Sequence, residues 1–87
     1  MCPIPQVSDW LKTVPPRKPQ QLKVLGETIR KHRNQTGFSQ EKLAEKSDLH
    51  PVYISKIERG EQWISLHALL RIARALGVRV KDLVADL

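Results

Sequence analysis

The sequence has little that would place the protein outside the cell or in a membrane. It contains one cysteine, Cys2, which cannot form an internal disulfide and therefore fits a reducing compartment. No apolar run approaches the roughly 20 residues that a membrane-spanning helix needs. The N-terminus also lacks the basic start and the apolar stretch of a signal peptide. We therefore expect a soluble cytoplasmic protein that does not interact with a membrane.

Catalytic and cofactor-binding motifs are missing as well. The chain has no Gly-rich phosphate loop, no pair of carboxylates in a recognisable frame and no nucleophile motif. Its three histidines, His32, His50 and His67, have neither the spacing of metal ligands nor a nearby cysteine. A chain of 87 residues also rarely encloses a deep pocket. We predict that the protein is not an enzyme, that it has no metal or cofactor, and that the histidines are structural or surface residues.

Positive charge is what the sequence has in excess. The formal net charge is +6, and six of the 15 Lys and Arg residues lie between Arg17 and Asn34, where Glu27 is the single acidic residue. A clustered basic surface suits a polyanion such as nucleic acid. A solvated helix face would carry the same charges, so charge alone leaves both interpretations open.

Prolines mark off the first segment of the chain. Five of the six prolines lie within residues 1–20, where each restricts its own backbone and disfavours helix in the preceding residue. The spacing of four apolar residues predicts a short helix over residues 8–14; they are Val7, Trp10, Leu11 and Val14. We predict an N-terminal extension over residues 1–20, which ends in a Pro-rich linker, and a folded domain over residues 21–87.

Apolar residues at helical spacing predict five short helices after residue 20, and no segment has the alternation of a strand. The first helix carries Leu22, Leu25 and Ile29 on one face and ends near Gly37. The second follows Ser39, which is a good capping residue. The predicted fold is therefore all-α.

The remaining helices have equally clear ends. The third begins at Pro51, since proline is tolerated at the first helical position, and ends at Gly60. The fourth follows Ser65 and ends at Gly77, and we expect it to turn inward Leu66, Leu69, Leu70, Ala73 and Leu76. The fifth is short and carries Val80, Leu83, Val84 and Leu87.

The segment from Ser39 to Gly60 is the most informative about function. A turn of only about four residues separates its two helices and forces them to cross at a steep angle. Ala44 supplies the small side chain that a close crossing requires. The outer face of the second of these helices then stays free and fits the roughly 12 Å major groove of B-DNA. That face carries Val52, Tyr53, Ser55, Lys56 and Arg59. An ordinary helical hairpin within a bundle is the alternative.

Two stretches carry a family resemblance, SQEKLAEK at residues 39–46 and YISKIERG at residues 53–60. Together with ALGV at residues 75–78, they resemble the phage repressor/Cro family, also called the XRE family, over residues 22–83. Leu49 and His50, taken with the second stretch, are similar to the controller proteins of restriction–modification systems. The resemblance implies a five-helix, lambda repressor-like domain that binds double-stranded DNA as a homodimer and regulates transcription.

The resemblance also implies roles at the start of the two crossing helices. Ser39 and Gln40 would contact a DNA phosphate, which agrees with the free N–H groups and positive dipole end of a helix N-terminus. In the turn, the family usually has glycine where this chain has Asp48, a residue that tolerates a left-handed backbone. We expect the turn to survive this change.

Base contacts are implied at the start and on the outer face of the third helix, by Pro51, Val52 and Lys56. Lys56 has a donor for guanine, and Val52 has an apolar surface for a thymine methyl group. Pro51 and Val52 replace the polar residues common in the family, so specificity would depend more on Lys56, on water and on DNA shape. Tyr53, Ser55 and Arg59 are the remaining expected DNA contacts, with Tyr53 and Arg59 assigned to phosphates.

The same resemblance implies two further contacts. Arg33 and Glu58 would form an ion pair under the third helix, although two unrelated surface charges are the alternative. The C-terminal helix would form the two-fold contact of the dimer through an exposed apolar side, made of Val80, Leu83, Val84 and Leu87. The N-terminal segment, whose apolar residues Val7, Trp10, Leu11 and Val14 could cross to the partner subunit, is the competing location. For Trp63, a core position, a phosphate contact and a dimer contact remain open.

Three functional hypotheses follow from the sequence. The leading one is a sequence-specific dimeric regulator that binds an inverted repeat, with half-sites about one helical turn apart. The second is an antitoxin-like or other protein-interaction module with the same fold. The third is a non-specific nucleic-acid binder that depends on the basic first helix.

Overall fold

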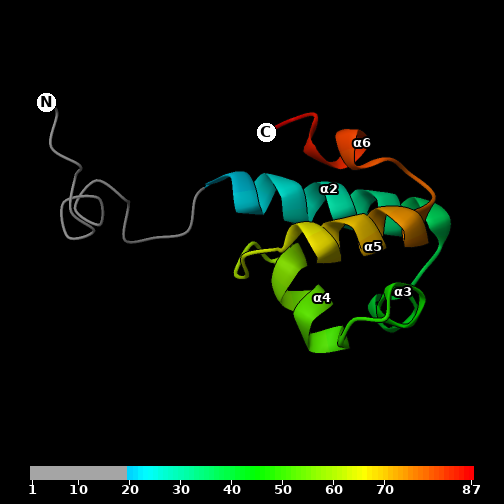
Figure 1. Ribbon diagram of the computed structural model, residues 1–87. Helices are drawn as coiled ribbons and strands as arrows, with labels where there is room; N and C mark the ends of the chain where they lie inside the picture. The colour runs from blue at the N-terminus through cyan, green and yellow to red at the C-terminus, as the bar shows by residue number, and fades with distance from the viewer. Residues whose placement is uncertain (1–19) are drawn as a thin grey trace, which may run out of the picture.

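The computed structural model describes residues 20–87, and within them it contains five helices and no strand. In chain order the helices are α2 (Gln20–Thr36), α3 (Gln40–Ser47), α4 (Pro51–Glu58), α5 (Leu66–Leu76) and α6 (Val80–Val84). The long helix α2 lies alongside α5, with α6 on one side of this pair and α3 and α4 on the other (Figure 1). The predicted all-α, five-helix fold is confirmed. The helix predicted over residues 8–14 and the Pro-rich linker lie outside the described residues.

Capping residues define the helix boundaries. The hydroxyl of Ser39 accepts a hydrogen bond from the backbone N–H of Lys42 at 3.0 Å, and Ser65 does the same for Ala68 at 3.1 Å. Each bond satisfies one of the N–H groups that the first turn of a helix leaves free. Gly77 follows α5 with a left-handed φ of 71°, which directs its N–H back to the last turn. These boundaries agree with the sequence-based prediction.

One apolar core joins the five helices. Each helix contributes one of its largest fully buried side chains, Ile29, Leu43, Ile54, Ile72 and Leu83. Burial of a side chain of this size stabilises the fold by about 1.5–3 kcal/mol. Ala44 is buried where α3 packs against the rest of the core, as its small side chain predicts. The core therefore holds α3 and α4 in a fixed relative orientation.

Helices α2 and α4 pack tightly against each other at Gly26. A Cβ atom at this position would lie 2.8 Å from the carbonyl oxygen of Glu58 and even closer to that of Ile57. Only glycine leaves room for this contact. The sequence analysis did not single out Gly26, because a glycine in a helix interior normally signals only a loss of stability.

The prediction that Leu66 and Leu70 point into the core is wrong. Their side chains are 67% and 51% exposed, and α5 instead buries Ala68, Leu69, Ile72, Ala73 and Leu76. Residues four apart share a helix face, so both leucines point outward together. Ile72, which was not among the residues expected to point inward, is fully buried instead.

The predicted exposure of Leu83 is also wrong, because this side chain is fully buried. Helix α6 packs against both α2 and α5, so its apolar side completes the core of one chain. Val80 and Val84 are half-buried against the same core, and Leu87 is exposed.

None of the helices in the described part of the chain is long and apolar enough to cross a bilayer.

Candidate nucleic-acid interface

One side of α4 is free of the core. Ile54 and Ile57 are buried, whereas the opposite side exposes Pro51, Val52, Lys56 and the following Arg59. Val52, Lys56 and Arg59 are spaced by four and three residues, so they lie along one helix face. No carboxylate within residues 20–87 forms an ion pair with Lys56. This face therefore presents an available ammonium group beside an apolar side chain.

The start of α3 lies next to this helix and is tied to it. Gln40, the first residue of α3, donates a hydrogen bond from Nε2 to Oε1 of Glu58 at 3.2 Å. Ser39 caps the same helix. Because Glu58 belongs to α4, its bond to Gln40 holds the N-terminus of α3 in place relative to α4. The two expected points of DNA contact are thus parts of one rigid arrangement.

Glu58 is the centre of that arrangement. Its carboxylate accepts hydrogen bonds from Nε of Arg33 at 2.7 Å and from Nη2 of Arg33 at 3.0 Å. The third donor of the same guanidinium, Nη1, binds the carbonyl oxygen of Phe38 at 2.8 Å. The side chains of Arg33 and Glu58 are only 11% and 3% exposed. The ion pair expected from the resemblance is present, and it connects α2, α4 and the approach to α3.

The turn between the two crossing helices is built around Asp48. This residue has a left-handed φ of 56°, as expected for the residue that replaces the usual glycine. Its carboxylate accepts a hydrogen bond from Nη1 of Arg71 at 3.3 Å, and its carbonyl oxygen accepts one from the same atom at 3.2 Å. Arg71 thus supports the turn from α5. The sequence did not reveal this contact, because the two residues are far apart in the chain.

His50 has a role that the sequence analysis missed. Its Nδ1 accepts a hydrogen bond from the backbone N–H of Val52 at 3.1 Å and so caps α4. An Nδ1 that accepts a bond leaves the hydrogen of the neutral ring on Nε2. A polar residue directly before Pro51 at the first helical position was the available signal for this cap.

Besides Ser39 and Gln40, two of the predicted contact residues have side chains with partners within the chain. The hydroxyl of Tyr53, which is half-buried, donates to the carbonyl oxygen of Trp63 at 3.4 Å. Arg59 forms an exposed ion pair with Glu61 at 3.0 Å, so a phosphate would compete with that carboxylate. Ser55 is half-buried on the same helix. Trp63 is 56% exposed, which excludes the core position considered for it.

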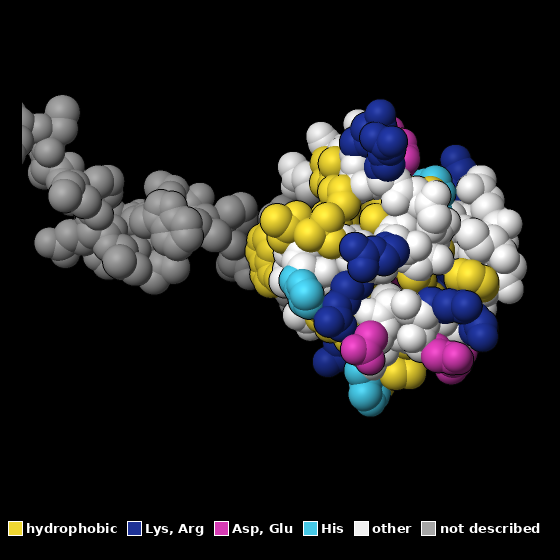
Figure 2. Space-filling view, turned by 45° about the vertical axis from the view of Figure 1, so that its right-hand side comes forward, with side chains coloured by type: hydrophobic (Ala, Val, Ile, Leu, Met, Phe, Trp, Pro, Cys, Tyr) yellow, Lys and Arg dark blue, Asp and Glu magenta, His cyan; other side chains and the backbone are white. Residues whose placement is uncertain are grey.

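Hydrophobic side chains also lie on the surface. In the space-filling view they gather on one side of the visible face, beside Lys and Arg side chains (Figure 2). The large exposed ones are Val52, Trp63, Leu66, Leu70 and Leu87. Among the described residues, no group of three His, Cys, Asp or Glu side chains has the arrangement of a metal site. The surface of this domain therefore offers charge and apolar area for a macromolecular partner.

A family model described as helix-turn-helix matches residues 29–83. The chain belongs to this helix-turn-helix family. It is similar to the control protein C.BamHI of Bacillus amyloliquefaciens, with 48% identity over 61 residues that cover 69% of this chain and 75% of that protein. The structure is similar to the restriction-modification controller protein C.AhdI from Aeromonas hydrophila, with 37% identity and a TM-score of 0.71 over 71% of this chain and 94% of that one.

A second solved structure points the same way. The clp gene regulator ClgR from Corynebacterium glutamicum has a TM-score of 0.74 and 34% identity, over 78% of this chain and 72% of that chain. This helix-turn-helix protein is thus a member of the XRE-type DNA-binding transcriptional regulators, and its resemblance to controller proteins is confirmed. Family membership also confirms that it is not an enzyme. Its helix-turn-helix consists of α3, the turn at Asp48, and α4.

Proposed function

We propose that this helix-turn-helix protein binds double-stranded DNA sequence-specifically as a homodimer and regulates transcription from an inverted-repeat operator in the cytoplasm. The observation that carries the proposal is the exposed face of α4, held against the N-terminus of α3 by Glu58. A helix exposed in this way fits the major groove, and a fixed neighbouring helix end sets its position on the backbone.

In this proposal the two helices have different tasks. Ser39 and Gln40 bind phosphate at the start of α3, which positions the protein without regard to sequence. At the start and on the outer face of α4, Lys56 donates to guanine, and Val52 packs on a thymine methyl group beside Pro51. Further backbone contacts come from Tyr53, Ser55 and Arg59. Since Pro51 and Val52 have no side-chain donors, much of the specificity depends on Lys56 and on DNA shape.

We place the two-fold contact on the exposed face of α5. Leu66 and Leu70 lie one turn apart on this face, and Trp63 precedes them in the loop with most of its side chain exposed. A C2 interface brings the same patch of both subunits together, so these apolar side chains would cover one another. The buried Leu83 cannot contribute. The competing location for the dimer contact is the C-terminal segment. There Leu87 is exposed, and Val80 and Val84 are half-buried against the core.

The names of two relatives support a proposal about the regulated genes. C.BamHI is named a control protein and C.AhdI a restriction-modification controller protein. We therefore propose that the operator lies beside genes of a restriction–modification system.

Selection of bound sequences from a random duplex pool tests the proposal. We expect enrichment of an inverted repeat whose half-sites are centred about one helical turn, roughly 34 Å, apart. Equal binding of enriched and random duplexes would instead indicate a non-specific nucleic-acid binder. Absence of binding to either duplex would indicate a protein-interaction module, such as an antitoxin-like partner. Both of these results would contradict the proposal.

A further inference from the structure

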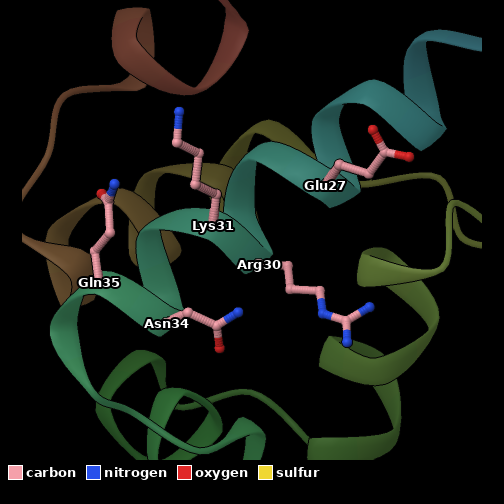
Figure 3. Close-up of a pocket in the computed structure, with 5 residues that line it drawn as sticks. All are labelled: Glu27, Arg30, Lys31, Asn34 and Gln35. Carbon is pink, nitrogen blue, oxygen red and sulfur yellow. The ribbon is translucent and has the colours of Figure 1, made fainter.

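The solvent side of α2 contains polar and charged groups that the contacts proposed above do not use. A shallow hollow of about 470 Å³ lies along this helix and is lined by Glu27, Arg30, Lys31, Asn34 and Gln35 (Figure 3). All five residues belong to α2. Two of them are cations and one is an anion, so the hollow has a net positive charge.

The two cations point in opposite directions. Figure 3 shows the guanidinium group of Arg30 extended toward α4, with the amide of Asn34 on the same side of the helix. Lys31 and Gln35 instead point toward α6, and the carboxylate of Glu27 is directed away from Arg30. Arg30 and Lys31 are adjacent in the chain and both are exposed. The side of α2 that faces α4 therefore carries one exposed cation, the guanidinium group of Arg30.

The neighbours of Arg30 on the same helix face also lie toward α4. Gly26 is four residues before Arg30 and touches the backbone of α4 at Ile57 and Glu58. Arg33 is three residues after Arg30 and binds the Glu58 carboxylate. Residues at these spacings share one helix face. Arg30 thus lies between two contacts to the end of α4, at the edge where Glu58 also binds Gln40.

We infer that Arg30, with Asn34 beside it, forms a second phosphate-binding site that holds the DNA backbone next to the phosphate bound at Gln40. This inference rests on the proposed function, because it needs α4 in the major groove. Within residues 20–87 no carboxylate forms an ion pair with Arg30. A guanidinium can bind two phosphate oxygens at once, and the Asn34 amide supplies a further donor. Contacts of this kind add affinity and register but no base preference.

The chain offers a matched pair of variants for the test. Arg30→Ala and Lys31→Ala each remove one exposed cation from adjacent positions of α2, so both lower the net charge of the protein by the same amount. They differ in the side of the helix that loses the charge. Affinity of each full-length protein is measured on the selected duplex and on a random duplex, at several salt concentrations, and the slope of log K against log salt is compared with wild type.

Each phosphate contact contributes about 0.9 to the magnitude of that slope. We expect Arg30→Ala to remove one contact from each subunit of the dimer, so the slope should become shallower by about 1.8 and both duplexes should be weakened by the same factor. The loss of affinity relative to wild type should then shrink about twelvefold between roughly 50 and 200 mM salt. Lys31→Ala should keep the wild-type slope. Melting temperatures of both variants should match wild type, since both side chains are exposed.

The possible outcomes separate the inference from the proposed function. Equal slopes for Arg30→Ala and Lys31→Ala, with wild type still preferring its selected site, would overturn the inference and leave the proposed function intact. A loss in Arg30→Ala that is confined to the selected duplex would also overturn it, because it would indicate a base contact. No preference of wild type for any duplex would overturn the proposed function itself, and the inference with it.

Discussion

Arg33 of α2 and Glu58 of α4 form a two-bonded ion pair, with Nε–Oε2 and Nη2–Oε1 distances of 2.7 and 3.0 Å. Their side chains are nearly removed from solvent, and no buried side-chain polar atom in the described part of the chain lacks a hydrogen-bond partner. The same carboxylate binds Gln40. The pair thus connects the stability of the fold to the geometry of the proposed DNA-binding surface.

Removal of one member of this pair should be strongly destabilising. Glu58→Ala leaves the Arg33 guanidinium buried without a counter-charge, and we expect a loss of about 3–5 kcal/mol in the free energy of unfolding. Glu61→Ala is the control, because it removes the exposed pair with Arg59 and should change stability by only about 0–1 kcal/mol. Urea denaturation measures both. Similar urea midpoints for the two variants would show that the buried ion pair stabilises the fold no more than the exposed one.

Gly26→Ala tests the close approach of α2 to α4, and the sign of its effect is diagnostic. In an ordinary helix interior this substitution stabilises by roughly 1 kcal/mol. Here the added methyl group meets the carbonyl oxygens of Ile57 and Glu58, so we expect overpacking to destabilise by about 1–3 kcal/mol. Thermal unfolding gives the sign directly. A raised melting temperature would mean that α2 and α4 can move apart with only a small loss in the free energy of unfolding.

Lys56→Ala tests base contact by α4. If the ammonium group binds a base edge, we expect a loss of about 1–3 kcal/mol on the selected site and a relaxed preference at one position of each half-site. Gln40→Ala removes the proposed phosphate contact and should weaken all duplexes about equally. Competition binding on selected and mutated duplexes separates the two. Equal losses for Lys56→Ala on specific and random DNA would exclude a role in specificity.

The dimer contact is tested with glutamate substitutions. Leu70→Glu places two like charges in a two-fold interface on α5, so we expect a folded monomer with much weaker operator binding. Leu87→Glu tests the C-terminal alternative and should leave the dimer intact. Leu83→Glu buries a charge in the core and should prevent folding. Sedimentation equilibrium and circular dichroism measure assembly and folding. A dimeric Leu70→Glu with a monomeric Leu87→Glu would move the interface to the C-terminus.

Local signals in the sequence predicted the helices well. The caps at Ser39 and Ser65 and the end of α5 at Gly77 each depend on the chemistry of one residue and a few neighbours, so they can be recognised without a structure. The left-handed backbone at Asp48 can also be recognised from the sequence, because aspartate tolerates this conformation through its own short polar side chain. The motifs between Ser39 and Gly60 identified the family for the same kind of reason. The number of residues between the two helices and the residue types around the turn are local properties that can be read from the sequence.

Tertiary packing decided which face of each helix is buried. The spacing of Leu66 and Leu70 is compatible with a core position, and only the placement of α5 against α3 and α6 turned both leucines outward. Leu83 became a core residue because α6 packs back on α2 and α5. The contacts of Gly26 with Glu58 and of Arg71 with Asp48 join residues distant in the chain. Such contacts depend on the relative positions of whole helices, which hydrophobic periodicity within one helix does not specify.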